Sequence, residues 1–103
     1  MTGVQYQADA ETDLIEIWLQ IADDGGYSRA DEYISGLRET CALLAGEPNM
    51  GVDRPDVAKG VRSFPVDRYV IYYEKHGSIL SVLRIWHSAH DPESLSIIEA
   101  EIF

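Results

Sequence analysis

The stretch Ile79-Leu80-Ser81-Val82-Leu83-Arg84-Ile85-Trp86 decides the fold of this chain. One side of its alternation carries Ile79, Ser81, Leu83 and Ile85, and the other carries Leu80, Val82, Arg84 and Trp86. Both sides are largely apolar, which is typical of a strand in the interior of a sheet. The stretch therefore predicts a central strand that is covered on both faces for part of its length.

Two further strand patterns precede this stretch. Residues 61–64 begin the first, and Pro65 marks its end or a bulge. Residues 68–74 form the second, and residues 75–78 make a turn of the length that closes a hairpin. The second half of the chain thus predicts three consecutive antiparallel strands.

The first half of the chain predicts a short edge strand at residues 4–7 and then two helices. Apolar residues recur at helical spacing over residues 10–23, where Asp9 is a candidate N-cap. A second periodic segment starts at Ser28, which with Asp31 resembles a capping box, and stops at Gly46. The glycine-rich turn between them predicts an antiparallel helical hairpin.

The order strand, helix, helix, strand, strand, strand, with a short C-terminal helix at residues 92–100, predicts the α+β class. In this arrangement the helical hairpin packs on a small antiparallel sheet. At 103 residues, the whole chain (1–103) is expected to form a single domain.

The net charge of −10 argues against broad binding to nucleic acid. Residues 1–47 contain ten acidic and two basic residues, whereas residues 48–91 contain five acidic and six basic residues. Two interpretations of this asymmetry stay open: a functional face on the second half, or acidic helices that aid solubility with arginines that pair locally.

The chain shows no secretory signal pattern and no apolar run long enough to span a membrane. Cys41 is the only cysteine, so no disulfide can form within the chain. We expect a cytoplasmic protein with no membrane association.

Candidate functional residues lie at the end of the last predicted strand, and one more, Arg62, lies in the strand that begins at residue 61. Arg62, Arg84, Trp86 and His87 combine arginines, which bind phosphate or anchor interfaces, with an aromatic ring and a group that titrates near neutral pH. The alternative is structural: Arg62 and Arg84 pair with nearby acids, and Trp86 belongs to the core. His87 and His90 lack a third strong ligand, so we expect no metal and no cofactor.

Six motifs in order over nearly the whole chain resemble the RelE/ParE superfamily of type II toxins. They are Asp13-Leu14-Ile15-Glu16-Ile17-Trp18, Ala30-x-x-Tyr33-x-x-x-Leu37, Leu44-Ala45-x-x-Pro48-x-x-Gly51-x-x-Arg54, Gly60-Val61-Arg62, Tyr69-Val70-Ile71-Tyr72-Tyr73 and Ile85-Trp86-His87-Ser88-Ala89-His90-Asp91. His90 departs from the pattern, because arginine is common in the family at that position. The resemblance implies a toxin that a cognate antitoxin neutralises, with a toxin–antitoxin heterotetramer or a larger assembly compatible with it.

The resemblance leaves two activities open. ParE-like members bind and inhibit DNA gyrase without a known catalytic site, and Arg62, Arg84, Trp86 and His87 would then contact the target. RelE-like members cut messenger RNA in the ribosome, and Arg62, Arg84 and His87 would then be catalytic. The acidic composition and the two lysines of this chain favour the gyrase-binding interpretation, in which the protein is not an enzyme and contacts no nucleic acid directly.

A third interpretation is a module that binds the antitoxin but has lost toxicity. The antitoxin-binding surface is left unassigned between the first helix and the outer side of the sheet. Because the chain is acidic, the antitoxin segment that binds it is expected to be basic.

Overall fold

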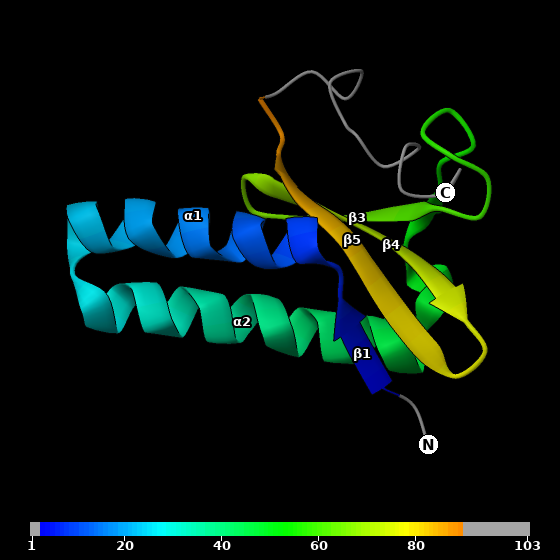
Figure 1. The fold of residues 1–103 in the computed structure, drawn as a ribbon, viewed down its shortest axis with the longest axis horizontal. Coiled ribbons are helices and arrows are strands. Elements are labelled where there is room, and N and C mark those ends of the chain that lie inside the picture. The colour runs from blue at the N-terminus through cyan, green and yellow to red at the C-terminus, as the bar shows by residue number, and fades with distance from the viewer. Residues whose placement is uncertain (1–2, 90–103) are drawn as a thin grey trace.

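The computed structural model describes residues 3–89 (Figure 1). Its elements are β1 (Gly3–Tyr6), α1 (Ala8–Gly25), α2 (Tyr27–Gly46), the 3-10 turn η1 (Pro48–Met50), β2 (Val52–Asp53), β3 (Arg62–Val66), β4 (Tyr69–His76) and β5 (Ile79–His87). α1 and α2 form a hairpin on one face of a five-stranded sheet. The α+β class and the helical hairpin are therefore confirmed. The predicted C-terminal helix lies outside the described residues.

Both helices begin earlier than their predicted caps. Gln7 is the N-cap of α1. Asp9 lies in the first turn, where the positive end of the helix dipole stabilises its negative charge. Gly26, at φ 89°, is the only residue between the helices, and this left-handed conformation favours glycine. Because α2 starts directly after Gly26, Ser28 lies inside the helix and does not cap it. Within residues 3–89 neither helix is both long and apolar enough to span a membrane.

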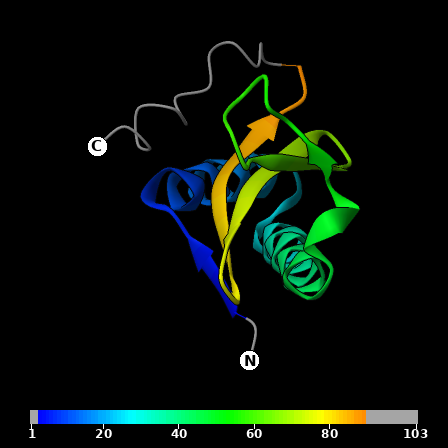
Figure 2. The same cartoon turned by 90° about the vertical axis from the view of Figure 1, so that its right-hand side faces the viewer.

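The sheet has the order β1-β5-β4-β3-β2, so β5 lies in its interior as predicted. β2, β3, β4 and β5 pair in antiparallel fashion, but β1 runs parallel to β5, with Gly3 opposite Ile79 and Tyr6 opposite Val82 (Figure 2). The sheet is therefore mixed, whereas the sequence predicted an antiparallel one. The helical hairpin carries the chain away from β1 before β3 begins, so no local turn signal reveals the direction in which β1 pairs.

A bulge in β5 changes which side chains face the helices. Val82 and Arg84 pair with successive residues of β4, so Leu83 has no partner in this ladder. Val82 and Ile85 both pack in the core beneath the helices, whereas Leu83 packs in a cluster on the other face. The strict alternation that the sequence predicted, with Ile85 beside Leu83, is wrong beyond Val82, because a bulge adds one residue to one strand.

Two apolar clusters cover the two faces of the sheet. The larger lies between the sheet and the helices and contains Ala10, Leu14, Ile17, Leu37, Cys41, Leu44, Ala45, Ile71, Tyr73, Leu80, Val82 and Ile85. The smaller lies on the opposite face and contains Val57, Val61, Tyr72 and Leu83. β5 contributes to both clusters, which confirms that it is covered on two faces.

The Tyr73 hydroxyl anchors the segment between α2 and β3 to the sheet. It donates to the Pro48 carbonyl at 2.6 Å and accepts from the Gly51 N–H at 3.0 Å. A β-carbon at Gly51 would collide with this hydroxyl, so only glycine fits there. Burial raises the pKa of Tyr73, so the phenol stays protonated and able to donate.

We expect Tyr73→Phe to destabilise the fold by about 1–3 kcal/mol, because it leaves the buried Gly51 N–H without its acceptor. Urea denaturation followed by circular dichroism measures the change. Tyr27→Phe is the matched control, since Tyr27 is 73% exposed, and its effect should stay within about 0.5 kcal/mol. Equal stabilities for the two variants would contradict the anchoring role.

Candidate functional site

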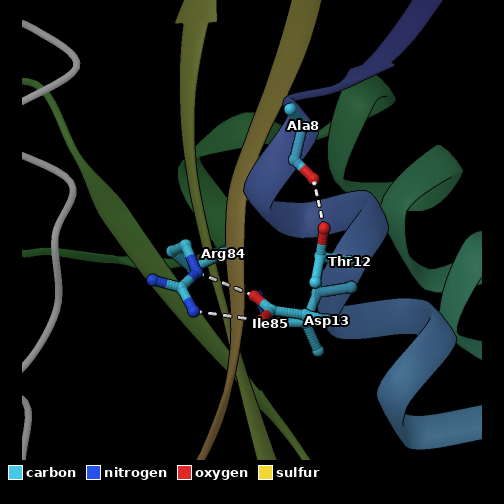
Figure 3. Close-up of polar contacts among 5 residues, drawn as sticks. All are labelled: Ala8, Thr12, Asp13, Arg84 and Ile85. Carbon is cyan, nitrogen blue, oxygen red and sulfur yellow. Dashed lines mark hydrogen bonds and ion pairs between the residues drawn. The ribbon is translucent and has the colours of Figure 1, made fainter.

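The centre of the site is an ion pair between α1 and β5 (Figure 3). The Arg84 guanidinium donates to Asp13 through Nε, at 2.8 Å from Oδ2, and through Nη2, at 3.0 Å from Oδ1. The same Oδ2 accepts the backbone N–H of Ile85 at 2.9 Å. The two charged side chains are only 15% and 9% exposed, so water screens this pair weakly.

Asp13 lies where the sheet loses its neighbouring strand. β1 ends at Tyr6, opposite Val82, and the chain then turns into α1. The backbone of β5 beyond Val82 has no strand beside it on that edge, and the Asp13 carboxylate accepts the N–H of Ile85 there. The carboxylate thus takes the place of a strand partner and neutralises Arg84 at the same time.

Arg84 also lies over the ring of Trp86, with its guanidinium carbon 4.8 Å from the ring centroid. The hydrogen bonds that Arg84 donates to Asp13 hold the pKa of Arg84 above its ordinary value, and the charges of Asp9 and Glu16 act in the same direction. Arg84 therefore stays charged, and the stacked contact is a cation–π interaction.

We call the side of the sheet that faces away from the helices the outer sheet face. It carries the smaller apolar cluster together with Val70 and Trp86. Arg54, from the segment that precedes β3, lies 5.6 Å from the ring centroid of Tyr72 and pairs with Asp56 at 2.8 Å. This face therefore combines aromatic rings with two arginines held in place, Arg54 and Arg84.

Arg62 does not join this group. It pairs across the strands with Tyr73, whose side chain faces the helices, whereas Arg84 pairs with Tyr72, which faces outward. Directly paired residues point to the same side of a sheet, so Arg62 and Arg84 lie on opposite faces. Arg62 donates to the Gly51 carbonyl at 2.8 Å, which gives it a structural partner at the β2 edge.

His87 also lies apart from Trp86. Its ring contacts Tyr69 edge-to-face, with centroids 5.3 Å apart, and its Nδ1 accepts the Ala89 N–H at 3.0 Å. Tyr69 packs against the larger core, on the helix side of the sheet. Of the four predicted residues, only Arg84 and Trp86 meet. The set Arg62, Arg84 and His87 is thus divided between the two faces.

The sequence indicated nearby acids as the partners of Arg84, and this prediction is wrong. Arg84 pairs with Asp13, which is 71 positions away in the chain. The sequence did contain a signal. Asp13 lies on the buried apolar side of α1, beside Leu14 and Ile17, and a buried carboxylate requires a cation or several hydrogen-bond donors. Among residues 3–89, no group of three or more histidines, cysteines or acids is placed to hold a metal ion.

We expect Asp13→Asn to destabilise the protein by about 3 kcal/mol, because it leaves Arg84 charged in a weakly hydrated position. Adding Arg84→Met should restore part of the loss, since the uncompensated charge is then gone. A double-mutant cycle from chemical denaturation measures the coupling, expected above about 1 kcal/mol. Strictly additive losses would show that the pair does not act as a unit.

The comparisons with known proteins show the family of this chain. The family described as the ParE toxin of the type II toxin–antitoxin system parDE matches residues 4–92. Toxin ParE3 of Caulobacter vibrioides is 26% identical over 73 residues, which cover 71% of this chain and 73% of the relative. A structure described as the chromosomal ParDE TA system from P. aeruginosa superposes with a TM-score of 0.72 at 22% identity, over 84% of this chain and 96% of that one. The family match spans both helices and all of the sheet but its first residue, and the chain belongs to the ParE toxins of type II toxin–antitoxin systems.

Proposed function

We propose that this toxin acts by binding and inhibiting DNA gyrase, and that the outer sheet face makes the contact. The observation that carries the proposal is the pairing of Trp86 with Arg84, which Asp13 holds fixed. Tryptophan and arginine are the residues that dominate interface energies most often, and a side chain that is already ordered loses little entropy on binding.

Membership of the type II family implies a cognate antitoxin as the neutralising partner. The gyrase target comes from the resemblance of the sequence to ParE-like members, which act by binding. Such an inhibitor needs no proton shuttle, so it requires no catalytic role for Arg62 or His87. Gyrase acts on the chromosome, so the proposal also places the protein in the cytoplasm.

The alternative is ribosome-dependent cleavage of messenger RNA. Cleavage by a 2′-hydroxyl needs a base, an acid and cations around one phosphate. In the described part of the chain the candidates Arg62, Arg84 and His87 are divided between two faces of the sheet, which favours binding over cleavage. The acidic surface of α1 also repels ribosomal RNA.

Gyrase-catalysed supercoiling with the purified toxin titrated in tests the proposal. We expect inhibition that the antitoxin relieves, and intact messenger RNA in a parallel assay with programmed ribosomes. Cut messenger RNA with unaffected gyrase would reverse the assignment. No effect in either assay would favour a non-toxic module that only binds the antitoxin.

Trp86→Ala should weaken gyrase inhibition by about tenfold or more, because it removes the aromatic anchor of the outer sheet face. Arg84 is a poor probe of the contact, since its loss also breaks the link to Asp13. Trp18→Ala is the matched control: Trp18 stacks on Tyr27 in the helical layer, away from this face. Circular dichroism confirms that both variants fold. Equal inhibition by the two would remove the outer sheet face from the proposal.

A further inference from the structure

α1 presents large apolar side chains to solvent. Ile15 is 59% exposed and Leu19 is 56% exposed, and they lie one helical turn apart. Beside them the Trp18 ring stacks on Tyr27, with centroids 5.4 Å apart, and Tyr27 is 73% exposed. We call these four residues, Ile15, Trp18 and Leu19 of α1 together with Tyr27 at the start of α2, the α1 stripe.

The α1 stripe is not explained by packing within residues 3–89. The side of α1 that faces the sheet carries Leu14 and Ile17, both buried in the larger cluster. At 100° per residue, Ile15 and Leu19 point to the opposite side of the helix. Contiguous apolar residues of this size on a small protein mark a surface for a partner.

The charges that α1 carries have one sign. α1 carries six acidic residues and no basic residue. Asp13 is neutralised by Arg84, but Glu11 and Asp23 are exposed one helical turn before Ile15 and one after Leu19, and Glu16 is exposed next to Ile15. Asp23 and Asp24 lie in the last turns, near the negative end of the helix dipole, where acids destabilise a helix. The helix dipole therefore gives no reason for the charges of Asp23 and Asp24, whereas a positively charged partner does.

We propose that the α1 stripe is the docking surface for a basic amphipathic helix of the cognate antitoxin. This rests on the toxin's having an antitoxin partner, and it is independent of the gyrase target. The i, i+4 spacing of Ile15 and Leu19 forms a ridge that fits the groove of a second helix. The acidic border pairs with lysine or arginine on the rim of that helix.

A second copy of the toxin is a poorer occupant of this surface. A symmetric contact would bring Glu11, Glu16 and Asp23 of one copy against the same acids of the other, and like charges repel. Nucleic acid is excluded by the same charges. A partner helix with basic residues on its rim satisfies both the apolar stripe and its border.

Isothermal titration of the toxin with the antitoxin encoded beside it tests the proposal. Ile15→Gln combined with Leu19→Gln keeps the net charge and the helix propensity, and should raise the Kd by about tenfold or more. The matched control is Leu43→Gln, a leucine on α2 that is 65% exposed and outside the stripe, which should leave the Kd unchanged. Circular dichroism confirms that each variant folds.

Removing the charges of Glu11, Glu16 and Asp23 tests separately whether charge contributes to antitoxin binding. Combining Glu11→Gln, Glu16→Gln and Asp23→Asn should weaken binding at low salt and flatten its dependence on ionic strength, because fewer charge pairs remain to be screened. A Kd for the glutamine double variant equal to that of the wild type would overturn the proposal.

The toxicity of the variants separates this inference from the proposed function. The double variant at Ile15 and Leu19 should still inhibit gyrase, but the antitoxin should relieve this inhibition poorly. Lost gyrase inhibition with retained antitoxin affinity would assign the stripe to the target instead. Sedimentation of the toxin alone should give a monomer, and a dimer that the double variant dissociates would assign the stripe to self-association. Weakened antitoxin binding without any wild-type gyrase inhibition would overturn the gyrase proposal and leave this one standing.

Discussion

The Asp13 carboxylate is the group on which the arrangement of this molecule depends most. It joins α1 to β5 through the side chain of Arg84 and the backbone of Ile85 at once. Either bond alone would leave a polar group poorly satisfied in a weakly hydrated place. Together they fix the position of α1 against β5, which lies between β1 and β4. They do so beside the bulge at Leu83, where the alternation of side chains along β5 shifts by one residue.

The bulge and the ion pair together decide which residues reach the outer sheet face. With the extra residue at Leu83, Arg84 lies on the same side as Trp86 and Tyr72, while Ile85 turns into the main core. A regular strand would exchange these assignments, since a shift of one residue moves every following side chain to the other face. The outer face thus owes its tryptophan–arginine pair to one irregularity in one strand, held by a carboxylate from the first helix.

The sequence predicted the elements that periodicity controls and missed those that long-range contacts control. The two helices, the β3–β4–β5 meander and the interior place of β5 follow from apolar spacing and turn residues, which are local properties. The parallel pairing of β1 with β5 and the partner of Arg84 join residues more than 70 positions apart, and no local pattern encodes them. The prediction of the site was the least accurate. Arg62, Arg84, Trp86 and His87 were expected to lie together, but the strand register places them on two faces of the sheet.

The same architecture separates the two proposed surfaces. The α1 stripe points away from the sheet, and the outer sheet face lies on the far side of it, so the larger core stands between them. An antitoxin helix seated on α1 therefore does not by itself cover Trp86. Neutralisation then requires either that the antitoxin continue around the sheet to the outer face, or that its bulk on α1 prevent gyrase from approaching. The rigid link from Asp13 to Arg84 disfavours a third route, in which docking on α1 rearranges the outer face, because breaking a buried pair costs about 3–5 kcal/mol. Direct or steric occlusion is thus the mode of neutralisation that this fold favours.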